Sequence, residues 1–395
     1  MSRTFRALQH RNARWFYSGL LVSNVGSWLQ LTAMSLLVYR LTDSATAVGV
    51  TWALQFLPML VLGVWAGAVA DRRDRRRLAI ATQAGQAVQA LALGVLDLAG
   101  WATVPVIYVM ALALGVVNTF DNPARRGFVT ELVVPADIGN AMALNTAVMT
   151  GSRIIGPALA ALLVGPLGTG WLFVLNGVSF AAIIGALMAI DVAALHPAER
   201  APRGGRPVRE AMAHVRSDRM LFVTFVTFAV VSTFGFNYNV VLPKLADVNW
   251  GGDHWFGWLL AVVSVGSLLG SLATAGRATV SAWWFLGNGS MVGVSALAMA
   301  WAPHVAWAFV LGVPLGFGGA AFVAGMNTLS QQACPPAMRG RMLALVAVAF
   351  LGSTPIGGPI SGWIGDAVSV EWSLAYGGII SLAALAWAWR QVRPL

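Results

Sequence analysis

Long apolar runs separated by short polar loops constrain this chain more than any other feature of its sequence. One run, from Ala47 to Ala70, leads directly into DRRDRRR, a stretch of five arginines and two aspartates. At a rise of about 1.5 Å per residue, roughly 20 apolar residues cross a hydrocarbon core about 30 Å thick. The run and its charged loop therefore predict a membrane-spanning helix that ends at a membrane surface.

Runs of this kind recur along the whole chain. The chain is 58% hydrophobic and 10% charged, whereas a soluble domain carries about 25% charged residues. The first run is too long for a signal-peptide core, so we expect it to remain as a helix. The predicted fold class is an all-α polytopic membrane protein with twelve transmembrane helices. These lie near residues 15–39, 47–70, 78–100, 104–122, 138–165, 170–192, 218–243, 255–276, 281–302, 305–328, 342–365 and 372–390.

The basic residues predict the orientation, because short loops rich in Lys and Arg stay in the cytoplasm. With twelve crossings and the N-terminus inside, every Lys and Arg except Arg40, Lys244 and Arg153 falls in a cytoplasmic segment. We therefore expect a multi-pass protein with both termini cytoplasmic. The net charge of +10 is interpreted as a topology signal, and no nucleic-acid partner is expected.

The one long connection divides the chain near its middle and is rich in Pro and Gly. We predict an N-terminal six-helix bundle over residues 1–192, a cytoplasmic linker over 193–217 and a C-terminal six-helix bundle over 218–395. In the second part of the linker, Val208, Ala211, Met212 and Val215 share one helical face. This pattern is typical of an interfacial helix, and a solvated linker helix fits it equally well.

The two halves also resemble each other. The segment VPADIGNAMALNTAVMTGSRIIGPALAALLVG from Val134 aligns with PPAMRGRMLALVAVAFLGSTPIGGPISGWIGD from Pro335, an offset close to half the length of the chain. Two six-helix bundles in parallel repeat, with substrate bound between them near the membrane midplane, are a transporter architecture.

The charged loop carries a family resemblance. It resembles the G-x-x-x-D-R-x-G-R-R loop between helices 2 and 3 of the major facilitator superfamily, with Asp74 where many members have glycine. The matching residues are Gly67, Asp71, Arg72, Arg75 and Arg76.

Three further segments carry the resemblance to that superfamily. Gly156-Pro157 is similar to the Gly-Pro signature of its drug and proton antiporters. FDNPARRGF from Phe120 and ELVVPADIGNAMALN from Glu131 resemble the bacterial branch that contains macrolide exporters and the enterobactin exporter. The resemblance covers the whole chain and implies an exporter in a bacterial plasma (inner) membrane that works by alternating access and proton antiport. The branch also contains lysophospholipid carriers, which leaves a lipid carrier or flippase as an alternative.

The loop suggests a gate. Asp71 could accept hydrogen bonds from the positive N-terminal end of a helix, helix 11 by family analogy, and Arg75 could bridge to Asp121. A solvated basic loop that only fixes topology is the alternative. The Gly-Pro pairs in helices 5 and 11 could bend or seal the helices, or simply allow close helix packing. These pairs are Gly156-Pro157 and Gly358-Pro359.

Neutral polar residues in the spans are candidates for binding substrate, although such residues also join helices to one another in membranes. They are Asn24, Gln30, Gln55, Asn145, Asn237, Tyr238 and Asn288. Arg153 is the one basic residue within a predicted span, and it needs partners at that depth. It could hold neighbouring helices in register or bind an anionic substrate group.

Asp97 and Asp121 are the candidates for a proton-coupling carboxylate. An interfacial residue in contact with water is the alternative for Asp97. The histidines show no metal-ligand spacing, the single cysteine Cys334 excludes a multi-cysteine site, and no G-x-x-x-x-G-K-[ST] motif is present. We expect no cofactor, no metal and no direct use of ATP.

Two function classes are weighed: a secondary transporter and a polytopic membrane enzyme. An enzyme needs a cluster of acid, base or metal ligands at a membrane surface, and the predicted outer loops are short and nearly empty of such groups. The sequence therefore predicts a transporter. Its expected partners are a small amphipathic substrate (drug, siderophore or lipid-like), the lipid bilayer and protons, and we expect a monomer.

Overall fold

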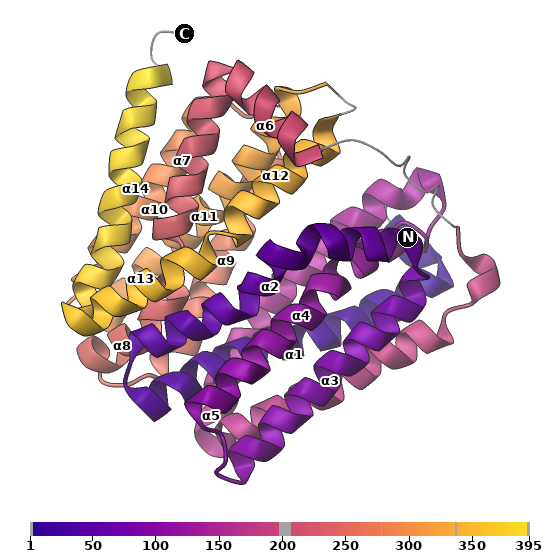
Figure 1. Cartoon of the computed structure of the whole chain (residues 1–395), viewed down its shortest axis with the longest axis horizontal. Helices are drawn as coiled ribbons and strands as arrows, with labels where there is room; N and C mark the ends of the chain where they lie inside the picture. Colours follow the sequence, from indigo (N-terminus) through magenta and orange to yellow (C-terminus); the bar gives the residue numbers. More distant parts are fainter. Residues whose placement is uncertain (1–2, 197–206, 278, 336–337, 393–395) are drawn as a thin grey trace. The chain divides into compact units, whose positions relative to one another are not determined.

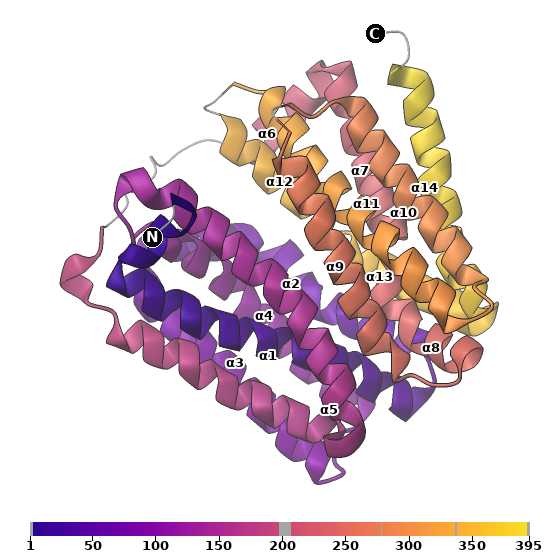
Figure 2. The same ribbon diagram turned by 180° about the vertical axis from the view of Figure 1, so that it is seen from behind.

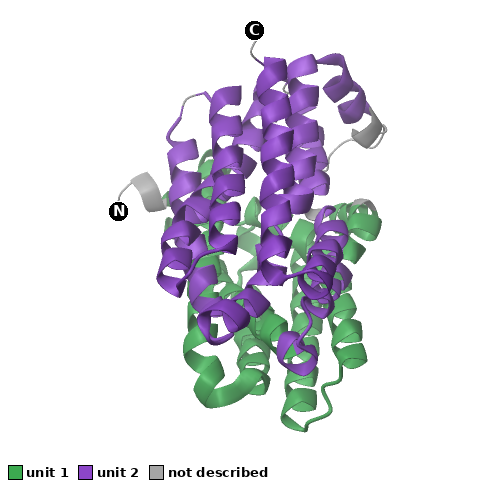
Figure 3. Ribbon diagram, turned by 90° about the vertical axis from the view of Figure 1, so that its left-hand side faces the viewer, with its two compact units in different colours: residues 1–37, 57–203 green, residues 38–56, 204–395 purple. Residues whose placement is uncertain are grey.

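The structure, a computed structural model, describes residues 3–196, 207–277, 279–335 and 338–392. Every regular element in these ranges is a helix, as predicted. The chain forms two compact units, shown in Figure 3: unit 1 is residues 1–37 with 57–203, and unit 2 is residues 38–56 with 204–395. The division near residue 203 falls inside the predicted linker 193–217, of which residues 197–206 lie outside the described part. Residues 38–56, which we had placed in the N-terminal bundle, group with unit 2.

Unit 1 is built from the long helices α1 to α5, which are coloured indigo to magenta and pink in Figure 1. Two of them pass from one unit to the other, since the last residues of α1 and the first residues of α2 belong to unit 2. The elements are η1 (Arg3–Gln9), α1 (Arg11–Thr42), α2 (Ala45–Arg72), α3 (Arg75–Leu98), α4 (Val104–Val129), η2 (Pro135–Asp137), α5 (Ile138–Ala189) and η3 (Val192–Ala194).

Helix α5 supplies two crossings. It has 52 residues, which as one straight helix would be about 78 Å long, far more than a bilayer requires. Gly168 interrupts it with φ +78°, a backbone conformation that is readily accessible to glycine and costly for other residues. The two arms on either side of Gly168 correspond to the predicted spans 138–165 and 170–192.

Unit 2 contains the remaining helices. Two predicted spans, 218–243 and 342–365, are each formed by a pair of shorter helices, α7 with α8 and α12 with α13. The elements are α6 (Pro207–Ser217), α7 (Arg219–Gly235), α8 (Tyr238–Trp250), α9 (Trp255–Ala275), α10 (Ala282–Ala300), α11 (Val305–Gln332), α12 (Arg339–Leu351), α13 (Thr354–Ala367) and α14 (Val370–Val392).

Helices α9 and α11 pack side by side in unit 2 (Figure 2). Glycines make this contact close: a Cβ added at Gly266 would collide with the Val313 carbonyl, and one at Gly316 with the Val263 carbonyl. Small residues that let two backbones approach in this way are typical of helix pairs in membranes.

Ten stretches in the described part of the chain are long and apolar enough to cross a membrane. One of them, Pro135–Ala189, contains both arms of α5, and the 19-residue helix α10 is not among the ten. The helices are therefore consistent with twelve crossings. With alternating crossings, one end of each unit carries the predicted cytoplasmic loops. We call this the inner end and the opposite end the outer end.

Helix α6 packs on protein, an arrangement that neither sequence interpretation anticipated. Ala211 and Val215 are buried in the hydrophobic core of unit 2. Glu210 forms an ion pair with Arg341 on α12, and His214 Nε2 lies 3.0 Å from the Ala333 carbonyl oxygen. Its apolar face is therefore covered by α7 and α12.

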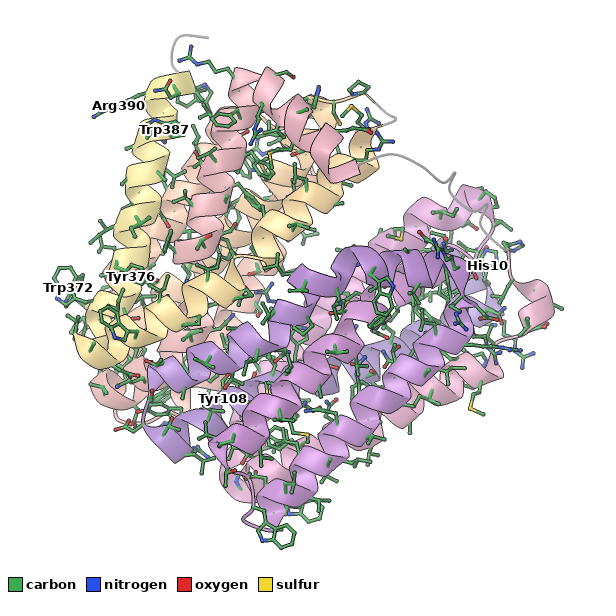
Figure 4. The ribbon with its side chains drawn as sticks, viewed as in Figure 1. His10, Tyr108, Trp372, Tyr376, Trp387 and Arg390 are labelled. Atoms are coloured by element: carbon green, nitrogen blue, oxygen red, sulfur yellow. The ribbon has the colours of Figure 1, made fainter. Side chains whose placement is uncertain are left out.

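Large apolar side chains are found both inside the units and on their surfaces. Phe16 and Phe228 are fully buried, whereas Trp171 is half exposed and Val88 is more than half exposed. Trp372, near the first turn of α14, is also half-exposed (Figure 4). Wide exposure of apolar surface on long helices is what a lipid environment requires.

Candidate functional site

A buried carboxylate organises the polar interior of unit 1. Asp121 on α4 is 1% exposed. Its Oδ1 accepts hydrogen bonds from Thr82 Oγ1 and Gln83 Nε2, each at 2.8 Å. Its Oδ2 lies 3.1 Å from Arg125 Nε, one helical turn further along α4. The ion pair and the hydrogen bonds give both oxygens of this buried carboxylate polar partners.

Arg125 connects this carboxylate to two other helices. Its Nη1 donates to Asn24 Oδ1 on α1 at 2.9 Å, and Asn24 Nδ2 in turn lies 2.9 Å from Met149 Sδ on α5. Ser23 Oγ donates to Gln83 Oε1 at 3.2 Å, which ties α1 to α3. We call these residues the Asp121 network. It joins α1, α3, α4 and α5 around a single buried carboxylate.

Beside this network lies a cavity of about 360 Å³ between α4 and α5, which we call the α4–α5 pocket. Asn145 was predicted to bind substrate, and it does line this pocket. Arg126 also lines the pocket and was not among the predicted residues. The full lining is Asn122, Arg125, Arg126, Met142, Asn145, Thr146, Met149 and Thr150.

Arg153 lies one helical turn beyond Met149 on α5. Its guanidinium carbon is 5.1 Å from the centre of the Trp28 ring on α1, close enough for a cation–π contact. At Gly156 an added Cβ would collide with the Trp28 side chain and the Val25 carbonyl. The Gly156-Pro157 element is therefore a point of close packing between α5 and α1.

The other predicted polar residues do not converge on this pocket. Several bond within their own helix or to a neighbouring helix, as the interhelical alternative expects. Gln30 donates to Gln89 at 2.9 Å and accepts from Asn176 at 2.7 Å. In unit 2, Asn237 and Asn288 each donate at 2.7 Å to a carbonyl of the preceding turn. Tyr238 is buried in unit 2, and the buried Oε1 of Gln55 has no hydrogen-bond partner.

The signature loop is bonded into unit 1. We expected Arg75 to reach Asp121, and this was wrong: Arg75 Nη1 bonds to Glu131 Oε1 at 2.9 Å, whereas Asp121 pairs with Arg125. Glu131 was not among the predicted partners of Arg75. Burial raises the pKa of Glu131 above its usual value, and Arg75 opposes this shift by favouring the charged carboxylate.

The neighbouring loop residues have distinct positions. Arg76 donates to the Leu187 and Met188 carbonyls at 2.6 and 3.2 Å, and so caps the end of α5. Asp74 accepts from the Arg77 backbone N–H at 2.9 Å as the N-cap of α3. Asp71 is left exposed over 67% of its side chain, 3.5 Å from Arg75. These bonds attach the loop to the ends of α4 and α5 in unit 1.

At the outer end of unit 2, one carboxylate caps the start of α2. Asp366 Oδ1 accepts from the Ala45 backbone N–H at 2.9 Å and from Lys244 Nζ at 2.8 Å. Asp366 Oδ2 accepts from Ser44 Oγ at 2.5 Å and from the Thr46 backbone N–H at 2.9 Å. The unpaired N–H groups and positive dipole end of a helix favour a carboxylate at this position.

Two further bonds reinforce this contact. Arg40 Nε and Nη2 hold Asp253 at 2.5 and 2.9 Å, a bidentate arrangement. Tyr39 donates to Asp247 Oδ2 at 2.7 Å. We call this group the outer clamp: residues 39–46 with Lys244, Asp247, Asp253 and Asp366.

The backbones of α2 and α13 pack closely next to the outer clamp. A Cβ added at Gly49 would collide with the Gly358 carbonyl, and one at Gly362 would collide with the Ala45 carbonyl. The Gly358-Pro359 element is therefore a contact point between α2 and α13. In unit 1, the outer-end residue Asp97 accepts from Thr169 Oγ1 at 2.5 Å and joins α3 to α5.

Comparison with known proteins places these features in a family. A family model described as transmembrane secretion effector matches residues 2–394. The multidrug efflux pump Tap of Mycolicibacterium fortuitum is 26% identical over 89% of this chain and 88% of that protein. Macrolide efflux protein A of Streptococcus pyogenes is 24% identical over 93% of each protein. The staphyloferrin A transporter of Staphylococcus aureus is 22% identical over 66% of each.

Solved structures share the fold. The nucleoside transporter NupG superposes with a TM-score of 0.79 at 14% identity, covering 96% of this chain and 99% of that one. A bacterial homologue of the human lysosomal transporter Spinster gives a TM-score of 0.75 at 14% identity, covering 100% of this chain and 98% of that one.

Proposed function

The chain belongs to the transmembrane secretion effector family of the major facilitator superfamily, and from this membership we propose that it exports small amphipathic molecules by alternating access in exchange for protons. Its relatives are membrane transporters, and the chain is a transporter with the major facilitator fold and not an enzyme. The observation that carries the proposal of export is the likeness to proteins named for macrolide and multidrug efflux over nearly the whole chain.

The outer clamp supports alternating access. It consists of hydrogen bonds and ion pairs at the outer end, several of them at partly exposed side chains. Such contacts form and break at a cost of only a few kcal/mol in total. Their breakage would release the start of α2 from α13 and open a path to the outer side. At the inner end, Asp71 and the Gly67–Arg76 loop are proposed to form the corresponding gate.

We propose Asp121 as the proton-coupling residue. Protonation would remove the negative charge that Arg125 and Gln83 hold in place. Proton binding would therefore loosen the contacts between α1, α3 and α4. Asp97 is a weaker candidate because its hydrogen bond to Thr169 lies at the outer end and joins only α3 and α5.

The substrate is proposed to be an amphipathic drug or siderophore. A lysophospholipid or similar lipid is the second candidate, favoured by the adjacency of arginines and methionines in the α4–α5 pocket. We further propose that the chain acts as a monomer in a bacterial plasma membrane with both termini in the cytoplasm.

Reconstitution of the purified full chain into proteoliposomes with an imposed pH gradient tests this function. The interior should be loaded in turn with a macrolide, a siderophore and a lysophospholipid. We expect one class to leave the vesicles faster when the proton concentration is higher outside than inside, because inward movement of protons drives outward movement of the substrate by exchange. The proton flux should depend on that substrate. Equal rates with and without protein for all three classes would overturn the proposal.

Asp71→Asn is expected to abolish transport while preserving expression and substrate binding. The contact to a helix end that we propose for Asp71 when the inner end is closed would be worth about 1 to 2 kcal/mol, which shifts a conformational equilibrium roughly 5- to 30-fold. Arg77→Asn is the matched control, since Arg77 lies in the same loop but is exposed over 84% of its side chain. Full transport by Asp71→Asn would show that the loop does not gate.

A further inference from the structure

We propose that the α4–α5 pocket binds the anionic group, a carboxylate or phosphate, of an amphipathic molecule, and that Arg126 is the cation that contacts it. This inference rests on the proposed function for the statement that the bound molecule is transported. Binding itself can be measured separately.

The charges of the pocket indicate an anion. Two of its lining residues are arginines and none is acidic. Arg125 is compensated by Asp121 and held in place by Asn24. In the described part of the chain, Arg75 and Arg125 form ion pairs in this region, whereas Arg126 forms none. The charge of Arg126 is therefore the one left for a ligand.

The remaining lining groups fit a small anionic group with an apolar attachment. A planar guanidinium suits carboxylate and phosphate oxygens. Asn122, Asn145 and Thr146 supply further polar groups, and Met142 and Met149 supply adaptable apolar surface. A volume of about 360 Å³ is near the lower end for small-molecule sites, so it suits the charged group and a short part of the attached body.

The position of the pocket connects it to the inner end. Arg126 lies three residues before the end of α4 at Val129, or about 4.5 Å along the helix axis. Along α5, the lining residues Thr146 and Met149 are followed on the same face by Arg153. Arg126 therefore lies near the inner end of unit 1, where an anion from the cytoplasm would enter.

The test is calorimetric binding of hexyl phosphate to the full chain in phosphatidylcholine nanodiscs, with empty nanodiscs as the blank. We expect saturable binding that Arg126→Gln weakens about tenfold or more, since a charge-assisted hydrogen-bonded contact is lost. Arg126→Lys, which keeps the charge, should lose less. Arg77→Gln removes the same charge outside the pocket and should bind as the wild type does.

Further arms of the test separate the source of the anion. Competition by phosphatidylglycerol in the nanodisc would identify a lipid headgroup site, whereas competition by citrate alone would identify a soluble anion. Either result supports the proposal that the pocket binds an anionic group. The proposal would be overturned if the wild type and Arg126→Gln bound hexyl phosphate with equal affinity. It would also be overturned if the wild type bound hexyltrimethylammonium as tightly as hexyl phosphate. Binding lost in Arg126→Gln without any transport in proteoliposomes would refute the exporter function and leave the anion site standing.

Discussion

Replacing Asp366 with alanine is expected to open the outer end of unit 2. The substitution removes the acceptor for two backbone N–H groups of α2, for Ser44 and for Lys244. Taken together, these charge-assisted bonds at a helix end are worth about 3 kcal/mol after allowance for their partial exposure, which corresponds to roughly a 100-fold shift in population. The reason for so large an effect is that one carboxylate holds four donors from two segments.

Spin-label distances measure this effect. Labels at Leu41→Cys and Val368→Cys in a Cys334→Ser background report the outer end, because both positions are exposed. We expect a single short distance in the parent protein and a longer, broader distribution in Asp366→Ala. Asp97→Ala removes an outer-end carboxylate outside the clamp and should keep the short distance. An unchanged distribution in Asp366→Ala would mean that the cap does not hold this end closed.

Removing the charge of Asp121 is expected to destabilise unit 1. Asp121→Leu leaves Arg125 in a largely buried position without its carboxylate, and loss of one partner of a buried pair typically costs about 3 to 5 kcal/mol. Gln83 and Thr82 also lose their acceptor. The melting temperature of the detergent-solubilised protein should fall markedly. Proton-coupled transport should be lost as well if Asp121 carries the proton.

A double-mutant cycle separates the charge effect from simple damage. Asp121→Asn combined with Arg125→Gln removes both charges, so it should be more stable than the single variant Asp121→Asn. If the double variant is less stable by the sum of the two single losses, the ion pair contributes nothing, and Asp121 is no more than a polar residue in the core.

The sequence allowed the fold to be predicted because its main signals are local. A bilayer demands about 20 apolar residues per crossing, and the runs of this length and the basic loops can be counted without knowledge of tertiary contacts. The breaks within spans were harder to predict. The break between α7 and α8 and the break between α12 and α13 each lie within an apolar run that was interpreted as one span, although Gly235 and Asn237 accompany the first break and Gly352 and Pro355 the second. Helix α6 packs through Ala211 and Val215 on a face that lipid could equally have covered.

The site was less predictable because its partners are distant in the chain. Arg75 has Asp71, Asp74 and Asp121 as plausible partners by sequence, and its bond to Glu131 depends on how the ends of α3 and α4 meet. The outer clamp joins residues 39–46 to three aspartates and a lysine more than 190 residues away. Arg126 follows Arg125 directly, and only the structure shows that both line a pocket while Arg125 alone pairs with Asp121.

Paired distances at both ends of the protein test alternating access most directly. One pair is Leu41→Cys with Val368→Cys at the outer end, and the other is Arg73→Cys with Ser217→Cys at the inner end. Each pair is measured in nanodiscs at high and low pH and with a transported substrate. Alternating access predicts that whenever the outer distance lengthens, the inner distance shortens, and that Asp366→Ala and Asp71→Asn shift the two populations in opposite directions. Distances that lengthen together, or that change independently of each other, would contradict it.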